Sequence, residues 1–521
     1  MISIPDIVGR QAFLCGARDR PALSFGGASL SFAALDRRAR RAANAFAGLG
    51  IRSGDRVAVL MGNGFAWHEV LFGLSAIGAV CVPVNVLLKG REVNHVIADC
   101  GAVALVADAV AQDALAQLAA LPDRLVRVGD FEVPSGTRWL DYEALLAAAS
   151  EARIARPAPP ASPAMIYYTS GTTGLPKGAV HSQAGVLWNT FHQIADCALT
   201  KDDVYLLVPS LSWSAGFHDI TLALMSIGGR VAMLPTGGTT IDRIVDAIER
   251  ERATRTLLVP TLLRQLIATP GAFARLRATR LRRIYTGAEP VPPSVMATVN
   301  AELPDCRVIQ IYGMSEFPLM MTILDAEDGL ANPERTGRAS SIVTLGVEQA
   351  DGSILDHGTG EVVVRSPATM LGYLGLAEAS EKALRGGWFR TGDTGVIDDE
   401  GFLTLNGRAK DMIISGGMNI YPREIENLIS RIDGVADVAV VGVPDDKWGE
   451  VPVAVVVARE GAAPEAAVRA ACAAELSPFK RPKSVILRGE ALPRTPTGKV
   501  LKRELRPWAE RMLGSGARDP Q

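Results

Sequence analysis

The chain has 521 residues, which is too long for one hydrophobic core and predicts two or three domains. Hydrophobic residues make up 48% and charged residues 21%, with a formal net charge of -2, so the composition argues against a polyanion-binding surface and against nucleic acid as a partner. The six cysteines are scattered singly, which argues against a disulfide framework or a zinc site and predicts buried thiols in a reducing compartment.

Targeting signals are weak in this sequence. Residues 1–10 lack a basic flank followed by a long apolar core, so we expect no secretion signal and a cytoplasmic protein. The run from Val70 to Leu88 is uncharged over 19 residues, which is long enough to consider a membrane span. Because Gly73, Gly78 and Pro83 interrupt it, we favour a buried helix followed by a strand, with the membrane span as the alternative.

Helix and strand patterns alternate along most of the chain, which predicts parallel α/β layering. Ser31 is expected to cap an Ala/Arg-rich helix. The Pro- and Ala-rich segment 156–163 predicts an exposed connector at a seam between two subdomains. An apolar helix is expected at 220–227, and strands are expected at 57–60, 80–84, 103–107, 164–169, 204–209, 230–234, 256–260 and 283–286.

The pattern changes in the last third of the chain. Short strands with Asp351-Gly352 and His357-Gly358 turns predict a small β-rich lobe at 337–365. A compact mixed α/β segment is expected beyond Gly407, with an unstructured tail after Gly514.

The segment from Tyr168 to Gly178 has what a polyphosphate-binding loop needs. Glycines allow close approach of the backbone to an anion, hydroxyls donate hydrogen bonds, and a lysine supplies charge. It is not the P-loop pattern, because Pro176 and Gly178 replace its Gly and its Ser or Thr. We predict a phosphate cradle after a strand, with a solvated linker as the alternative; its residues are Thr169, Ser170, Gly171, Thr172, Thr173, Gly174 and Lys177.

This segment resembles the signature of the adenylate-forming enzymes, the superfamily of acyl-CoA synthetases, peptide-synthetase adenylation domains and beetle luciferases. Further segments match the family pattern in order and spacing from about Ser29 to Leu505. The resemblance implies an α/β fold with a large N-terminal domain of two α/β-layered subdomains and a small β-rich lobe. That domain, 1–407, would bind ATP and the acid. A hinge at 408–410 would join it to a small, mobile α+β C-terminal domain at 411–521.

The resemblance also implies which residues hold the nucleotide. Tyr312 would stack on adenine, Glu316 would bind Mg²⁺ as a hard oxygen ligand, and Asp393 would accept hydrogen bonds from the ribose hydroxyls. Arg408 would also reach the ribose. The remaining nucleotide contacts implied are Gly287, Ala288 and Glu289 in an adenine-side loop, with Gly313 and Ser315 beside Tyr312.

Three features near the C-terminus resemble the parts that move in this family. Lys410 would be the hinge, and Gly416 and Gly417 would line the tunnel for the pantetheine arm of coenzyme A. Lys499 would enter the active site during adenylation and stabilise negative charge in the transition state. The implied catalytic set is therefore Lys499, Glu316, Thr169 and Lys177.

The acyl site departs most from the family pattern. Trp213 stands about where many relatives place a histidine or a smaller aromatic residue, and Ile311 stands where many have Gly. His218 is interpreted as packed or solvated rather than catalytic. Asp219 lies several residues beyond the position where amino-acid-activating relatives hold an acid. The side chains predict a mainly apolar pocket for a neutral group, formed by Trp213, Phe217, Gly287, Ile311, Gly313, Met314 and Pro318.

The resemblance implies an ATP- and Mg²⁺-dependent acid–CoA ligase acting on a neutral aliphatic, alicyclic or aromatic acid, with no transmembrane segment and a homodimer left open. An acyl-AMP ligase that loads a carrier protein, a peptide-synthetase module and a catalytically silent nucleotide-binding protein are alternatives. Lys480, Arg481 and Lys483 either contact the phosphates of coenzyme A or form a solvated basic run.

Overall fold

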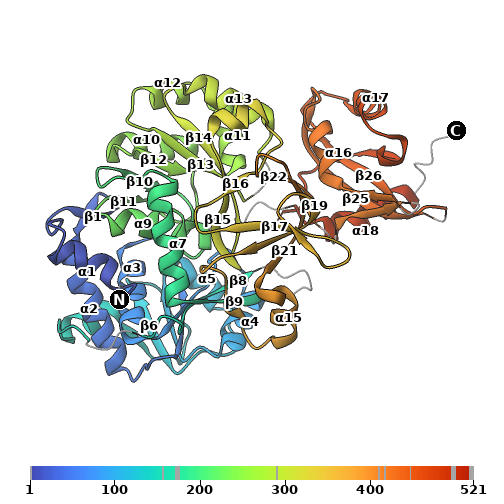
Figure 1. The fold of residues 1–521 in the computed structure, drawn as a ribbon. Coiled ribbons are helices and arrows are strands. Elements are labelled where there is room, and N and C mark those ends of the chain that lie inside the picture. Colours follow the sequence, from blue (N-terminus) through green and yellow to red (C-terminus); the bar gives the residue numbers. More distant parts are fainter. Residues whose placement is uncertain are drawn as a thin grey trace.

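A computed structural model of the chain describes residues 3–154, 158–169, 176–288, 291–408, 411–415, 418–445, 447–494 and 500–514, with the backbone alone at 318, 319 and 419. The predicted fold class is confirmed: a large α/β N-terminal part is followed by a small C-terminal domain, which projects to the right in Figure 1. Within the described ranges, the strands form three sheets, one of which belongs to the C-terminal domain.

The largest sheet has 14 strands among the described residues. Its pairs are parallel from β1 through β11, β10, β12 and β13 to β14, and antiparallel beyond β14 and at the β1–β2 edge. In spatial order the strands are β18 (Ile354–Leu355), β17 (Thr344–Glu348), β19 (Gly358–Arg365), β21 (Phe389–Ile397), β22 (Phe402–Arg408), β16 (Gly337–Ala339), β15 (Phe317–Leu324), β14 (Arg307–Met314), β13 (Arg283–Thr286), β12 (Arg255–Leu257), β10 (Val204–Leu207), β11 (Arg230–Met233), β1 (Pro21–Phe25) and β2 (Ala28–Ser31).

The second sheet is parallel except for the β8–β9 and β9–β20 pairs. Its strands in spatial order are β20 (Gly372–Tyr373), β9 (Lys177–Ser182), β8 (Pro163–Thr169), β4 (Val80–Pro83), β3 (Arg56–Leu60), β5 (Ala104–Asp108), β6 (Arg124–Val128) and β7 (Trp139–Asp141). The helices of the N-terminal part are α1 (Asp6–Phe13), α2 (Phe32–Gly48), α3 (Phe65–Ile77), α4 (Gly90–Cys100), α5 (Gln112–Leu115), α6 (Tyr142–Ala148), α7 (Gln183–Asp196), α8 (Ser214–His218), α9 (Thr221–Ser226), α10 (Ile241–Glu251), α11 (Pro260–Ala268), α12 (Ala272–Arg277), α13 (Pro293–Glu302), α14 (Ala326–Ala331) and α15 (Ala377–Ala383).

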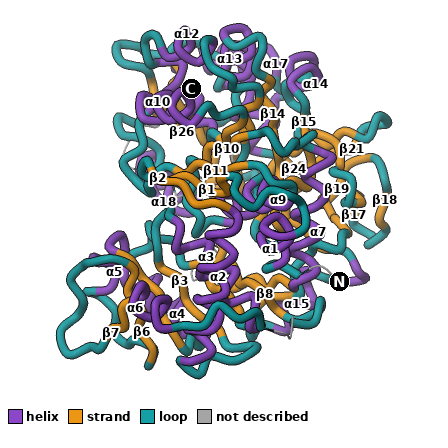
Figure 2. Tube along the Cα trace, turned by 90° about the vertical axis from the view of Figure 1, so that its left-hand side faces the viewer, coloured by secondary structure: helices purple, strands orange, loops and turns teal. Residues whose placement is uncertain are grey.

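One hydrophobic core joins the two sheets. It takes side chains from β1, β10 and β11 on one side, from β3, β4 and β8 on the other, and from the helices between them. Figure 2 shows α2 and α3 lying between the strands of the two sheets. The strands predicted from sequence are confirmed as β3, β4, β5, β8, β10, β11 and β13, and the helix predicted at 220–227 as α9. The strand predicted at 256–260 is only partly right, because β12 ends at Leu257 and Pro260 begins α11.

The uncharged run at 70–88 forms most of α3 and all of β4, as predicted. Gly78 ends the helix in a left-handed conformation with φ 75°. Gly73, expected to interrupt the run, lies inside the helix and does not break it. It lies against α2, where a Cβ atom would come within 2.8 Å of Ala42 Cβ. None of the described helices is long and apolar enough to cross a membrane.

The predicted subdomain seam at 156–163 is wrong. β8 begins at Pro163 and pairs with β4 at Met165, so the chain before and after this segment contributes to the same sheet. The β-rich lobe is present, but β16, β17 and β19 continue the largest sheet in antiparallel fashion rather than forming a sheet of their own. Local composition does not show which distant strand will pair with a given strand, so it could not predict either arrangement.

The C-terminal domain has its own sheet and two hydrophobic clusters of its own. A helix at its N-terminal end, α16, packs on β22 of the N-terminal part. The elements are β23 (Ile413–Ser415), β24 (Met418–Ile420), α16 (Pro422–Ile429), β25 (Val435–Asp445), β26 (Gly449–Ala458), α17 (Glu465–Glu475), β27 (Ser484–Leu487) and α18 (Lys502–Gly514).

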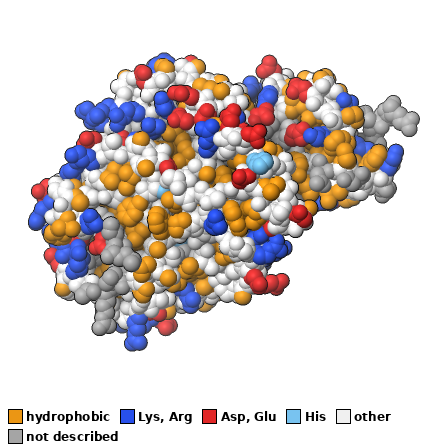
Figure 3. Space-filling model, viewed as in Figure 1, with side chains coloured by type: hydrophobic (Ala, Val, Ile, Leu, Met, Phe, Trp, Pro, Cys, Tyr) orange, Lys and Arg blue, Asp and Glu red, His pale blue; other side chains and the backbone are white. Residues whose placement is uncertain are grey.

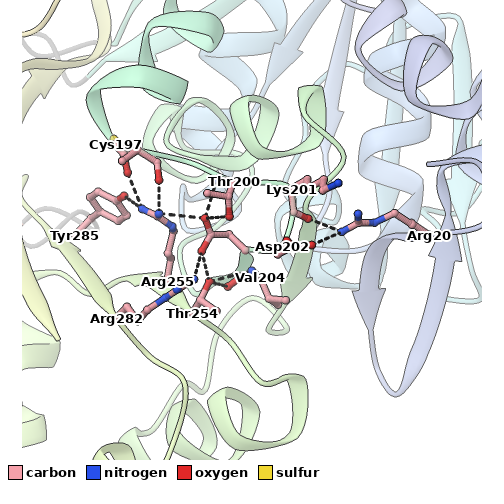
Figure 4. A network of polar contacts seen from close by, with 12 residues as sticks. Arg20, Cys197, Thr200, Lys201, Asp202, Val204, Thr254, Arg255, Arg282 and Tyr285 are labelled. Carbon is pink, nitrogen blue, oxygen red and sulfur yellow. Dashed lines mark hydrogen bonds and ion pairs between the residues drawn. The ribbon is translucent and has the colours of Figure 1, made fainter. Parts of the chain in front are cut away.

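A polar network holds the amino-terminal ends of the parallel strands of the largest sheet (Figure 4). The Asp203 carboxylate accepts hydrogen bonds from the Thr254 hydroxyl at 2.7 Å and from Arg282 at 3.0 Å, and it pairs with Arg255 at 3.1 Å. Arg255 also donates to the Tyr285 hydroxyl at 2.7 Å. Burial pushes the pKa of Asp203 upward, but the Arg255 and Thr254 hydrogen bonds outweigh burial and hold the pKa at about 2.

The surface matches the near-neutral composition. Charged side chains of both signs are spread over the face of the molecule in Figure 3. Of the cysteines, five are buried as predicted, whereas Cys15 is exposed just beyond α1.

Candidate active site

The predicted site residues follow the carboxyl ends of parallel strands in both sheets. Thr169 ends β8, Trp213 lies beyond β10, Gly287 follows β13, and Tyr312 lies near the end of β14. Loops at these ends are where α/β proteins place their ligands, because the strands present their carboxyl ends at one edge. Thr169 belongs to one sheet and Tyr312 to the other, so the predicted site residues come from the strand ends of both sheets.

Glu316 connects the two sheets at this edge. It lies in the turn between β14 and β15, and its Oε1 atom accepts a hydrogen bond from the Thr169 hydroxyl at 3.3 Å. The Tyr373 hydroxyl donates to the same oxygen at 3.2 Å. Tyr373 lies on β20, which pairs with β9, and the Lys177 ammonium lies 5.5 Å from the centre of its ring. The phosphate-cradle residues Thr169 and Lys177 therefore lie beside the predicted metal-binding carboxylate.

His181 supports the turn that carries Glu316. Its ring is fully buried and its Nε2 atom lies 2.8 Å from the Ser315 carbonyl oxygen. Burial lowers the pKa of His181 to about 4, so the ring is neutral at pH 7, and Nε2 carries the proton because a carbonyl oxygen can only accept. The Ser315 hydroxyl is 3.0 Å from that of Ser214 on α8. Ser315, next to Glu316 in the turn, is thus held through both its carbonyl oxygen and its hydroxyl.

A second cluster surrounds Asp393 on β21. Tyr312 donates a hydrogen bond to Oδ2 at 2.5 Å, and Arg408 pairs with Oδ1 at 3.0 Å. Arg408 lies directly opposite Asp393 in the antiparallel register of β21 and β22. Burial, together with the nearby Asp393 carboxylate, raises the pKa of Tyr312 well above its usual value, which keeps the hydroxyl protonated as a donor. The predicted adenine and ribose residues are therefore in contact with one another.

On the acyl side, Gly287 lies against Ile311. A Cβ atom on Gly287 would overlap the Ile311 carbonyl oxygen and come within 3.0 Å of its side chain, so no other residue fits there without movement. The next residue, Ala288, has φ 71°, a left-handed conformation that costs a non-glycine residue energy and that is frequent at functional sites. Gly313 and Met314 complete β14 beside them.

The α8 segment is packed more tightly than its sequence indicates. Phe217 is fully buried, and its ring centre lies 5.1 Å from that of Trp67 and 5.1 Å from that of His218. His218 is fully buried, which agrees with its interpretation as a packed histidine. Burial also raises the pKa of the fully buried Asp219 well above its usual value, and neither of its oxygens has a donor among the described residues, so this carboxyl group is not placed to pair with a substrate ammonium group.

Several predicted site residues lie outside the described part of the chain. They are Ser170, Gly171, Thr172, Thr173, Gly174, Glu289, Lys410, Gly416, Gly417 and Lys499, together with the side chain of Pro318.

Sequence reasoning missed three residues that the fold brings to this edge. Tyr373 and His181 contact the Glu316 turn, and Arg423 of α16 lies close to Asp393 across the domain boundary. None of the three stands in a pattern that points to a ligand. The nearest signal is the position of His181 directly after the apolar pair Ala179-Val180 in a strand, since a buried histidine calls for a hydrogen-bond partner.

Comparison with known proteins places this geometry in a family. The chain is 38% identical to an indoleacetate–CoA ligase of Aromatoleum aromaticum and 36% identical to a long-chain-fatty-acid–CoA ligase of Mycobacterium tuberculosis, over 94% and 92% of both chains in the respective pairs. Its fold matches a solved Mycobacterium tuberculosis fatty acyl CoA synthetase with a TM-score of 0.76 at 32% identity, covering 98% of this chain and 99% of the other. The protein-family model of the AMP-binding enzymes matches residues 12–374, and the model of their C-terminal domain matches residues 424–499. The chain therefore belongs to the AMP-binding, adenylate-forming enzymes.

Proposed function

We propose that this protein is an ATP- and Mg²⁺-dependent acid–CoA ligase that forms acyl-AMP and then acyl-CoA in one site. The observation that carries the proposal is the Glu316 carboxylate held by Thr169 and Tyr373 at the edge where the two sheets meet. The chain is 36% and 38% identical to two named CoA ligases over more than nine-tenths of its length, which supports the same assignment.

The residues around Glu316 fit a magnesium ion. Both described hydrogen bonds reach Oε1, and among the described residues none reaches Oε2. Carboxylate and hydroxyl oxygens are the ligands that this hard cation prefers. Glu316 would hold the ion with the Thr169 hydroxyl nearby, and the ion would offset charge on the nucleotide phosphates.

Adenylation would use the N-terminal domain. Asp393 would accept hydrogen bonds from the ribose hydroxyls, Tyr312 would lie against adenine, and Lys177 would balance phosphate charge beside Tyr373. The acid carboxylate would attack the α-phosphate, a new oxygen–phosphorus bond would form, and pyrophosphate would leave. The cradle residues 170–174 and Lys499 would stabilise the charge that builds up in this step.

Thioester formation would follow a rotation of the C-terminal domain about Lys410. The movement would withdraw Lys499 and present Gly416 and Gly417 to the pantetheine arm. The thiol would then attack the carbonyl carbon of the acyl-AMP, with AMP as the leaving group. The packing of α16 on β22 supports a contact between the two domains that such a rotation would exchange.

The acid is proposed to be neutral and of moderate size. Ile311 fills the space beside Gly287, and Asp219 is a fully buried carboxyl group with a raised pKa rather than an accessible partner for the ammonium group of an amino acid. Aliphatic, alicyclic and aromatic acids fit this description equally well.

The decisive experiment measures pyrophosphate release from ATP across a panel of these acids, with and without coenzyme A. At least one acid should give CoA-dependent turnover, and Lys499→Ala should lose roughly a hundredfold or more in acyl-AMP formation while converting synthetic acyl-AMP to thioester at a near wild-type rate. Pyrophosphate release that is followed by transfer only to a carrier-protein thiol would establish the carrier-loading alternative. Nucleotide binding without pyrophosphate release from any acid would support a silent binding protein.

A further inference from the structure

Arg423 brings a positive charge from the C-terminal domain to the edge of the nucleotide site. It lies in the first turn of α16, which faces β22 in the arrangement of Figure 1. A Cβ atom on Gly407 would lie 4.0 Å from Arg423 Cβ, so the arginine passes directly beside the residue that precedes Arg408. The guanidinium lies within electrostatic reach of Asp393 and Tyr312.

This guanidinium has no hydrogen-bond or ion-pair partner among the described residues. Its Nε atom is shielded from solvent without an acceptor. The Asp393 carboxylate does not pair with it, since the described contacts of its two oxygens are with Tyr312 and Arg408. Glu426, the other nearby carboxylate, is paired with Lys502 at 2.7 Å. A shielded arginine nitrogen without an acceptor is unfavourable and calls for a partner.

A neighbouring arginine shows what a satisfied boundary contact looks like. Arg431, just beyond the end of α16, also reaches the N-terminal domain, where it pairs with Glu334 at 2.6 Å. Both partners are well exposed, at 43% and 59% of their side-chain surface. Arg423 and Arg431 line the same small crevice between the domains, opposite Gln310 and Arg335. Of these two arginines, Arg431 has its counter-charge and Arg423 does not.

The charges around Arg423 indicate which kind of group would pair with its guanidinium. The described partner of Asp393 is Arg408 and that of Glu426 is Lys502, so Arg423 keeps a positive charge that no described carboxylate pairs with. Arginine binds phosphate through paired N–H donors, and a nucleotide whose ribose lies at Asp393 carries its phosphate next to that ribose.

We propose that Arg423 is a phosphate-binding residue of the nucleotide site, supplied by the C-terminal domain. This inference rests on the proposed function in that coenzyme A, which also carries phosphates, would enter at the same boundary. The shared chemistry is a phosphate bound by Arg423, and the source is either the adenylate or coenzyme A.

Calorimetric titration of the full-length protein tests this assignment without any turnover. Wild type, Arg423→Gln, Arg423→Lys and the matched control Arg431→Gln are each titrated with AMP, adenosine and coenzyme A, and thermal unfolding without ligand checks that each variant is folded. We expect Arg423→Gln to weaken AMP binding tenfold or more and to leave adenosine binding within twofold of wild type. The AMP affinity of Arg423→Lys should lie between those of wild type and Arg423→Gln. Arg431→Gln should bind all three ligands as wild type does.

The remaining outcomes separate the sources and the alternatives. Loss of coenzyme A affinity with unchanged AMP affinity assigns the phosphate to coenzyme A. Equal loss for AMP and adenosine means that Arg423 only positions Asp393, and unchanged affinity for all three ligands removes it from the site; either result overturns the proposal. If Arg423→Gln does not fold, the comparison of AMP with adenosine in Arg423→Lys decides. Wild-type protein that binds AMP but releases no pyrophosphate would refute the proposed ligase and leave this assignment standing.

Discussion

Two carboxylates in the N-terminal domain, Asp203 and Asp393, each pair with an arginine but differ in what remains open around them. Asp203 is fully buried and accepts from the Thr200 backbone, two threonine hydroxyls and Arg282 in addition to its pair with Arg255. Asp393 has two donors, Tyr312 and Arg408, and a second positively charged side chain, Arg423, lies nearby with no partner among the described residues.

Under the proposed function, the difference separates a structural ion pair from one that binds a ligand. A carboxylate whose acceptor positions are all used cannot bind a substrate. Its hydrogen bonds and ion pair instead stabilise the packing of the strand ends. A carboxylate that shares its surroundings with an unmatched cation retains capacity to bind, at some cost in stability. Substitutions in the two regions should therefore act on different observables.

Removing the Asp203 charge should give the largest effect on stability. Asp203→Asn leaves Arg255 buried without its counter-charge, which should cost about 3–5 kcal/mol of unfolding free energy. Urea unfolding followed by circular dichroism measures this loss. Asp202→Asn is the matched control, because Asp202 is the adjacent residue, is 72% exposed and has only a 3.4 Å contact with Arg20. Similar losses in both variants would show that the network is not the cause.

Removing the Glu316 charge should act mainly on catalysis. Glu316→Gln keeps an oxygen that can accept from Thr169 and Tyr373 but loses the charge that a magnesium ion needs. Acyl-AMP formation should fall about a hundredfold, which corresponds to about 2.7 kcal/mol of activation free energy, with little change in melting temperature. Glu327→Gln, at a residue that is 82% exposed on the surface, should keep full activity. A drop in stability that accounts for the lost activity would contradict the assigned role.

The Asp203 network also predicts how stability depends on pH. The pKa of Asp203 is about 2 in the folded protein, whereas an aspartate in the unfolded chain has a pKa of about 3.9. The lower folded value stabilises the protein fully above the unfolded pKa, and about 2–3 kcal/mol is lost as the pH falls through 3.9 towards 2. The difference in unfolding free energy between wild type and Asp203→Asn should therefore shrink between pH 5 and pH 2.5. A constant difference over that range would rule out this linkage.

The smallest expected effect concerns the acyl pocket. Ile311→Ala should shift the preference of the enzyme towards longer or bulkier acids by about fourfold per additional methylene, or ~0.8 kcal/mol. Ile309→Ala is the control, because Ile309 lies two residues earlier on β14 and is also buried. Values of kcat/KM over a series of acids measure the preference. The same ranking of acids in both variants would make Ile311 a packing residue.

Part of the site could be predicted because its residues stand in continuous segments. Thr169 ends a strand whose apolar run is visible in the sequence, and Tyr312 and Glu316 stand four positions apart on one strand and its turn. Tyr373, His181 and Arg423 could not be predicted, because each contacts or lies close to a residue at least 30 positions away. The wrong seam at 156–163 has the same origin, since Pro and Ala report local exposure but not strand pairing.

The sequence by itself determined the family, the α/β alternation, the caps of helices such as Ser31 on α2 and the segments that carry the chemistry, because these depend on neighbouring residues and on side-chain type. Only the tertiary structure decided that β1 pairs with β11 more than 200 residues later, that Glu316 receives hydrogen bonds from Thr169 and Tyr373, and that Arg423 Nε is shielded at the domain boundary with no acceptor among the residues described. The physical reason is that the charge balance and the hydrogen-bond partners of a side chain are set by everything packed around it, which chain order does not encode.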